Sequence, residues 1–283
     1  MIIKYQHLSL LFILLFLTKT GKLQAQEDLY NLQNSEKYAR YLLAGRQYKL
    51  AAEELERLVF LDKSNEEYKN LLITAYYKTG NSRKAIERLH QLYNGNLPAM
   101  PESISSKYLV LLQESDSLPQ ILHYLDSDIK IKNTDKLLFK WSNLMLNKSF
   151  VDAKRFLDTH PQELGSIKEI AQINDFALKQ KHKSPWLAGT LSAIIPGLGK
   201  VYTGNYVDAA TAFIFVGGNA FQAYRGFQKN GSKSAFGWIF GTIAAGFYVG
   251  NIFGSAKAAI RFNNLKFYET KTKVDTYFQH RYF

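Results

Sequence analysis

Apolar residues recur every three or four positions from residue 27 to residue 182, which places them on one face of an α-helix. No part of this region alternates apolar and polar residues over the length of a half-buried strand. After Lys183 the pattern changes to long apolar segments with few charges. The chain is therefore predicted to be all-α, with a polar helical region followed by an apolar one.

The apolar region contains three candidate helices. Residues 186–195 are too few to cross a bilayer, so this helix is expected to re-enter the membrane or lie at its interface, with Trp186 and Tyr202 at head-group depth. Residues 206–224 and 235–256 are each long enough to cross. The prediction is a transmembrane helical hairpin preceded by a short re-entrant or interfacial helix. The alternative is a soluble protein that uses these helices as its core.

Glycines recur at four-residue spacing in the second apolar span. Such spacing forms a smooth groove along one helix face, which lets another helix backbone approach closely. The expected partner is the first span, which carries Gly217 and Gly218, or a second copy of the chain, which would make a homo-oligomer. The predicted helix-packing positions are Gly237, Gly241, Gly246, Gly250 and Gly254.

The N-terminus resembles a secretory signal, with Lys4 before an apolar run and Ala25 at the cleavage position. An uncleaved anchor is the alternative. Residues 225–234 join the two spans and hold three positive charges and no acid, which favours the cytoplasmic side of an inner membrane. The chain is therefore assigned to the cell envelope, at the inner membrane with its polar helical region in the periplasm. Association with the outer membrane stays an alternative.

These features predict four segments. They are a signal peptide at 1–25, a helical repeat domain at 26–183, a membrane-embedded helical domain at 184–264 and a basic aromatic tail at 265–283. The tail is expected to form an interfacial amphipathic helix.

The polar region contains an internal repeat of 34 residues, in which Ala51 and Ala85 hold equivalent places ahead of Leu55 and Leu89. Residues 73–89 combine an aromatic helix, a glycine turn and an alanine-centred second helix. This pattern resembles the tetratricopeptide repeat family, with a further copy at 147–156 and a degenerate one at 115–125. The resemblance implies a helical hairpin array that binds a protein partner. Its expected repeat-packing residues are Tyr48, Ala51, Tyr76, Gly80, Ala85, Phe150 and Ala153.

A compact motif lies between the short apolar helix and the first span. It is formed by Pro196, Gly197, Gly199, Tyr202 and Gly204. The segment lacks the spacing of a phosphate-binding loop. It resembles a Pro-Gly-x-Gly-x-x-Tyr-x-Gly element of small two-span bacterial membrane domains, which typically carry Gln where this chain has Lys200. That resemblance implies no enzymatic activity and a loose link to envelope biogenesis.

Charge and chemistry narrow the function classes. The chain of 283 residues has a net charge of +12 and no Cys. No basic stripe with interleaved aromatics is present, so the excess charge is assigned to membrane flanks and lipid head groups rather than nucleic acid. The absence of Cys excludes disulfides and thiolate metal sites. No catalytic, cofactor-binding or metal-binding constellation is found, and the chain is not expected to be an enzyme.

Three polar residues lie in or beside the predicted spans. Asp208 is expected to favour the first turn of its helix, where the helix dipole accepts negative charge. Asn219 and Asn251 are expected to form hydrogen bonds across helices.

Two functions follow from these observations. The first is a membrane-tethered periplasmic scaffold in envelope biogenesis, whose helical repeats bind a protein partner and whose hairpin contacts membrane lipid. The second is a membrane-active component, either a helper of membrane protein insertion or an oligomeric channel, that acts through the C-terminal hairpin.

Overall fold

The computed structural model describes residues 30–283 except 116, 128 and 166. Over these residues it contains fourteen α-helices, α2 to α15, and no strand, which confirms the all-α prediction. The described residues form two compact units, one ending at Leu111 and one beginning at Leu112. The predicted signal peptide lies outside the described residues, and the predicted boundary at 183/184 stays a prediction.

The first unit is a series of helices that pack on their sequence neighbours, α2 on α3, α3 on α4 and α4 on α5. Ala51 and Ala85 are fully buried near the starts of α3 and α5, where a larger side chain would push the neighbouring helix away. Gly80 has a φ of +76° in the turn before α5, a conformation that favours glycine. The elements are α2 (Leu32–Ala44), α3 (Tyr48–Leu61), α4 (Glu66–Lys78), α5 (Ser82–Leu92), the short 3₁₀ helix η1 (Leu97–Ala99) and the start of α6 (Glu102–Glu114).

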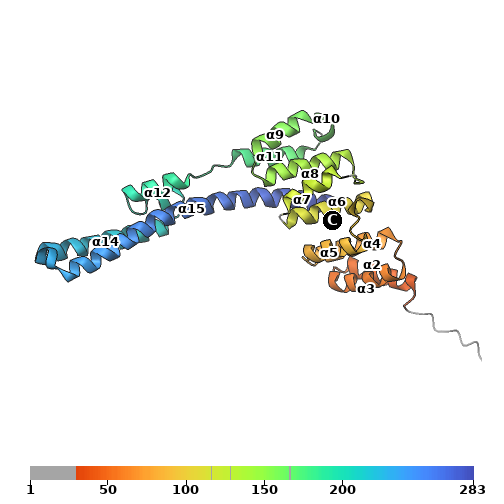
Figure 1. Ribbon diagram of the computed structural model, residues 1–283, viewed down its shortest axis with the longest axis horizontal. Coiled ribbons are helices and arrows are strands. Elements are labelled where there is room, and N and C mark those ends of the chain that lie inside the picture. Colours follow the sequence, from red (N-terminus) through yellow and green to blue (C-terminus); the bar gives the residue numbers. More distant parts are fainter. Residues whose placement is uncertain (1–29, 116, 128, 166) are drawn as a thin grey trace, which may run out of the picture. The chain divides into compact units, whose positions relative to one another are not determined.

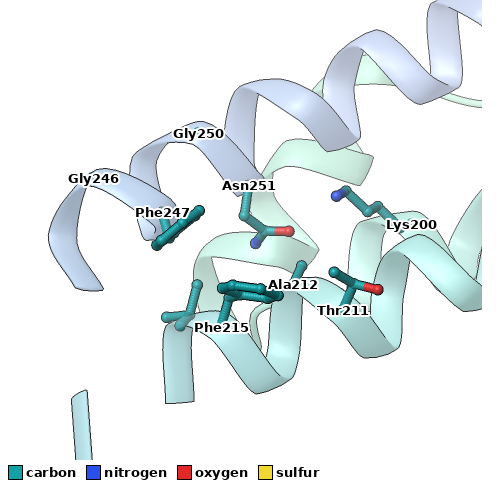
Figure 2. A pocket seen from close by; sticks show the side chains of 9 residues that line it. Lys200, Thr211, Ala212, Phe215, Gly246, Phe247, Gly250 and Asn251 are labelled. Carbon is teal, nitrogen blue, oxygen red and sulfur yellow. The ribbon is translucent and has the colours of Figure 1, made fainter. Parts of the chain in front are cut away.

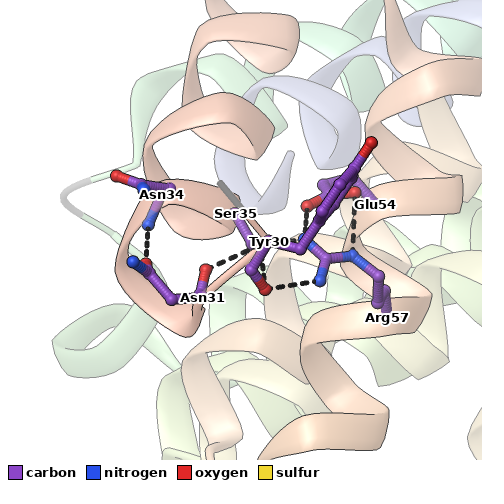
Figure 3. Close-up of polar contacts among 6 residues, drawn as sticks. All are labelled: Tyr30, Asn31, Asn34, Ser35, Glu54 and Arg57. Carbon is purple, nitrogen blue, oxygen red and sulfur yellow. Dashed lines mark hydrogen bonds and ion pairs between the residues drawn. The ribbon is translucent and has the colours of Figure 1, made fainter. Parts of the chain in front are cut away.

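Polar contacts fasten the start of this series (Figure 3). Asn31 caps α2 by accepting a hydrogen bond of 2.8 Å from the backbone N–H of Asn34. Arg57 of α3 donates to the backbone carbonyl of Tyr30, to Ser35 and to the carboxylate of Glu54. The Arg57 guanidinium therefore links Tyr30, which precedes α2, to α2 and α3.

Lys107 is a buried cation in the first unit. Its side chain is 9% exposed, and its Nζ donates to Thr74 Oγ1 at 2.6 Å. Burial, and to a smaller extent the nearby charge of Lys78, lowers the pKa of Lys107 from 10.5 to about 8.

We expect the stability of the first unit to rise between pH 8 and pH 10.5. In this range unfolded chains bind more protons than folded ones, because the folded-state pKa of Lys107 is the lower of the two. Lys107→Met should remove this rise and stabilise the unit at pH 7 by about 1–3 kcal/mol. Pulse proteolysis of the full chain at increasing urea concentration measures the effect. The quantity followed is the fraction of residues 30–111 that stays uncleaved. The exposed Lys49→Met is the control, and an unchanged pH dependence in Lys107→Met would contradict the prediction.

The second unit contains five short helices, called the arm helices here, and a longer helical hairpin. The arm helices are α7 (Leu118–Asp126), α8 (Asn133–Leu146), α9 (Phe150–Thr159), α10 (Pro161–Leu164) and α11 (Lys168–Lys179). They are followed by α12 (Pro185–Ile194), α13 (Leu198–Tyr202), α14 (Tyr206–Asn230), the 3₁₀ helix η2 (Gly231–Lys233) and α15 (Ala235–Tyr282). Figure 1 shows α14 and α15 side by side with opposite directions, and α12 beside α15.

Helix α15 is longer than the sequence predicts. It has 48 residues, which corresponds to about 72 Å at 1.5 Å per residue, and it includes both the predicted second span and the predicted tail. Helix α14 is also longer, because it continues to Asn230 through most of the segment expected to be a loop. The connection between the two helices is therefore only η2 and its flanking residues.

The C-terminal part of α15 packs against α8 and α11. Phe278 is fully buried, and its ring centroid lies 4.8 Å from that of the buried Phe139 in α8. The pair Arg281–Asp135 adds a contact of 2.9 Å between α15 and α8. This end of the chain does not form the interfacial helix that its basic and aromatic composition suggests, because its aromatic side chains complete the core of the arm helices.

Among the described residues, α15 is the one helix that is both long and apolar enough to cross a membrane. Only 17% of its most apolar 18-residue stretch is buried, whereas the core helix of a soluble protein would be mostly buried. Helix α14 is not both long and apolar enough by the same measure. That α14 crosses the membrane beside α15, as a transmembrane hairpin requires, is therefore a proposal.

Candidate functional site

The glycine motif forms a tight reversal between α12 and α14. Gly197 has a φ of +90°, and a Cβ there would overlap the backbone carbonyl of Ala209. Gly199 lies against α12, where a Cβ would overlap the backbone carbonyl of Ala188. Gly204 has a φ of +85° just before α14 begins. Each glycine therefore has a steric or conformational reason in the fold.

Hydroxyl groups beside this reversal join α12 to α15. Ser192 and Ser255 are both fully buried, and their Oγ atoms lie 2.7 Å apart. The backbone N–H of Gly199 donates to Ser192 Oγ at 2.9 Å. Tyr248 donates to the carbonyl of Ala193 at 2.6 Å. The network holds the ten-residue α12 against the long helix. The sequence analysis did not single out either serine. A polar residue inside an apolar helix indicates a hydrogen bond to another helix, and this could have identified them.

The segment that connects α11 to α12 is fixed to α15. Asn263 accepts from the N–H of Lys183 and donates to its carbonyl, both at 2.8 Å. Tyr202 accepts from the N–H of Ser184 at 3.1 Å, and the Lys183 ammonium lies 4.5 Å from the Tyr202 ring centroid. Ser184 caps α12 and Pro185 occupies its first turn. The end of this connection that leads into α12 is therefore held by α15 and Tyr202.

The glycines of α15 have two kinds of surroundings. A Cβ on Gly237 would lie 2.8 Å from the Phe227 ring, and one on Gly241 would lie 3.7 Å from Ala223, so α14 and α15 are close there. By contrast, a Cβ on Gly246 or Gly250 would meet no atom within 4 Å. One on Gly254 would approach only Lys200 Cε, at 3.8 Å. In α14, Gly217 and Gly218 likewise face open space.

A pocket of about 420 Å³ opens between α14 and α15 beside Gly246 and Gly250 (Figure 2). Lys200 lies at one end of it, and Figure 2 shows the Asn251 amide between Lys200 and the Phe247 ring. At the other end the Phe215 and Phe247 ring centroids are 5.2 Å apart. Its lining residues are Lys200, Thr211, Ala212, Phe215, Val216, Gly246, Phe247, Gly250 and Asn251.

The polar groups of the hairpin differ in their contacts. Asp208 is exposed in the first turn of α14, as expected. Asn219 donates to the Phe215 carbonyl of its own helix at 2.6 Å, so its hydrogen bond does not cross between helices. Asn251 does cross, since its amide donates to the Ser192 carbonyl at 3.3 Å. The side-chain oxygen of Asn251 is buried and has no hydrogen-bond partner.

The first unit has a mixed-charge cleft of about 720 Å³ where α3, α4 and α5 meet. Glu56 lies in this cleft and accepts from the Tyr76 hydroxyl at 2.7 Å and from Arg88 at 2.7 Å. Burial and this carboxylate raise the pKa of Tyr76. Lys49, Glu53 and Lys84 also line the cleft, which therefore presents both signs of charge.

The predicted repeat positions are mostly interior. Tyr76 and the three alanines are buried, whereas Tyr48 and Phe150 are half-buried. Ala153 stands in α9 of the second unit, where Trp141 of α8 donates to Asn174 of α11 at 3.2 Å. These surroundings fit packing positions.

Within the part of the chain that the structure describes, no three His, Asp or Glu side chains gather to hold a metal ion. Comparison of the chain with protein-family models, with curated proteins and with solved structures gave no match. The functional argument therefore starts from the hairpin, the pocket between α14 and α15, and the cleft of the first unit.

Proposed function

We propose that this protein is a membrane-anchored scaffold of the cell envelope, in which the helical repeat region binds a protein partner on the periplasmic side. One observation carries the proposal. The first half of α15 exposes large apolar side chains, among them Trp238, Ile239 and Phe253, whereas its last turns pack against α8 and α11. A single helix therefore joins an apolar anchor to a polar helical body.

The surfaces of α12 and α14 support the same anchor. Trp186 of α12 is 78% exposed, and Phe213, Ile214 and Phe221 of α14 are also exposed. Contiguous exposed apolar surface of this kind is typical of membrane or protein contact. Three positive charges, Arg225, Lys229 and Lys233, lie at the far end of the hairpin and would face the cytoplasm.

The anchor is tested by fractionation. Full-length protein should stay in the membrane pellet after alkaline carbonate extraction. Protease added to spheroplasts should cut the repeat region but leave the basic end of the hairpin intact until the inner membrane is opened. Release of the full-length chain by carbonate would mean that the apolar surface is covered by protein, and the anchor would be rejected.

Partner binding is proposed at the mixed-charge cleft of the first unit. The resemblance to tetratricopeptide repeats and the opposite charges of Glu53 and Lys84 favour an extended polar segment there. A photo-crosslinking residue at position 53 should yield one discrete adduct in cells, and the same residue at the exposed Arg83 should not. Equal adducts at both positions would contradict a specific cleft.

The competing function is a membrane-active component that works through the hairpin. The glycines of α15 that face open space favour it, since they leave room for another helix. Exchange of residues 184–256 for an unrelated hairpin separates the two functions. A scaffold keeps its adduct and its cellular function after the exchange, whereas a membrane-active component loses its function.

A further inference from the structure

We propose that the pocket between α14 and α15 binds one anionic phospholipid, with the phosphate at Lys200 and an acyl chain along Phe215 and Phe247. The proposal goes beyond partner binding. It requires insertion of the hairpin in the membrane but no occupant in the cleft of the first unit.

The order of side chains along the pocket matches that of a lipid. Along α15, Gly246 and Phe247 precede Asn251 and lie on the side toward η2. Figure 2 shows the Asn251 amide between the Phe247 ring and Lys200, with Lys200 at one end of the pocket. The polar end is therefore outermost and the apolar end points toward the middle of the hairpin. The alternative occupant is a helix from a second copy of the chain, packed on Gly246 and Gly250. Such a helix would have no use for the Lys200 ammonium at one end of the pocket.

The depth of the polar end is also suitable. Sixteen residues of α15 separate Ala235 from Asn251, which is about 24 Å of helix. The hydrocarbon core of a bilayer is about 30 Å thick. With the basic end of the hairpin at one surface, Lys200 lies near the head-group boundary of the opposite leaflet.

Two polar groups at this end have unused capacity. The Lys200 ammonium makes one long hydrogen bond, of 3.4 Å, to the Asp208 carbonyl, and an ammonium can donate three. Asn251 is 5% exposed, and its side-chain oxygen accepts no hydrogen bond. Such a buried acceptor costs free energy unless a donor reaches it. A phosphate with a neighbouring hydroxyl, as in phosphatidylglycerol, supplies an acceptor for Lys200 and a donor for Asn251.

The rest of the pocket has room for an acyl chain. Gly246 and Gly250 offer no side chain, and the volume of about 420 Å³ lies within the range of about 300–1,000 Å³ that is usual for ligand pockets. The aromatic rings give the chain an apolar wall, and the side open to the membrane lets the lipid enter laterally.

Native mass spectrometry of the full-length protein in detergent tests the proposal. It is titrated with phosphatidylglycerol or with phosphatidylcholine of the same acyl chains. We expect one phosphatidylglycerol to bind about tenfold more tightly, which corresponds to about 1.4 kcal/mol. Both lipids carry the phosphate, but the choline group adds a positive charge beside Lys200 and has no hydroxyl to donate to Asn251. Lys200→Gln should remove this preference. Lys257→Gln, which removes the same charge from an exposed position of α15, should keep it.

A second variant tests the apolar part. Gly250→Leu places a side chain in open space and should block binding without disturbing the contact between α14 and α15 near Gly237. Three outcomes would overturn the proposal. They are equal losses in the two lysine variants, binding of acyl-free glycerol phosphate as tight as that of the lipid, and a dimer without lipid that Gly250→Leu converts to monomer.

Discussion

Replacement of Phe278 by alanine is expected to destabilise the arm helices by about 3–5 kcal/mol. Phe278 is fully buried although it lies five residues from the chain end, and it packs against Phe139 and Tyr282. Loss of the ring leaves a cavity between α15 and α8 in addition to the lost apolar burial. A chain shortened before residue 265 should show an even larger effect, because the whole α15 contact is removed.

Unfolding of the arm helices can be followed by the fluorescence of Trp141, which is fully buried in α8. Tyr268→Ala is the matched control, since Tyr268 is an aromatic residue of the same helix that is exposed. Its expected change is within about 0.5 kcal/mol. If Phe278→Ala and Tyr268→Ala behaved alike, the end of α15 would not be part of this core.

This prediction also affects how the repeat region is produced. A chain that ends at Lys183 lacks the helix end that fills the core of α8 and α11. Partner-binding experiments should therefore retain residues 257–283, as the proposed exchange of the hairpin does.

The second large effect is expected at Gly199. Alanine there would place its Cβ on the backbone carbonyl of Ala188 and near Ser192, so α12 or α13 must move. Overpacking usually costs about 1–3 kcal/mol, and a clash with backbone belongs at the upper end of that range. The displaced α12 would also lose the hydrogen bonds that Ser192 makes with Gly199 and Ser255.

Limited trypsin digestion of the full chain in lipid nanodiscs measures this change. Cleavage after Lys200 should be slow in the parent protein, because its segment is packed between α12 and α14, and fast in Gly199→Ala. Gly218→Ala is the control, since a Cβ there meets nothing within 4 Å and alanine favours a helix. Slow cleavage in both variants would show that α12 tolerates the shift.

Local features of the chain were predictable from its sequence. The period of apolar residues and the 34-residue spacing of Ala51 and Ala85 are both patterns along one backbone. Gly197 and Gly204 follow the same rule, because positive φ is a property of the single residue. For this reason the helices and the position of the glycine motif follow from sequence reasoning.

Long-range contacts were not predictable in the same way. The aromatic residues near the C-terminus suit a membrane interface as well as a protein core, because hydropathy measures transfer out of water and not the identity of the partner. Similarly, the spacing of Gly246 and Gly250 indicates a smooth helix face but does not show whether another helix covers it.

The sequence by itself therefore determined an all-helical chain with an apolar C-terminal region, since backbone geometry and burial period are local. Only the tertiary structure decided that α15 is continuous with the arm core and that Lys200 and Asn251 line the same open pocket. These contacts join residues tens of positions apart, and their formation depends on how α12, α14 and α15 pack together in space.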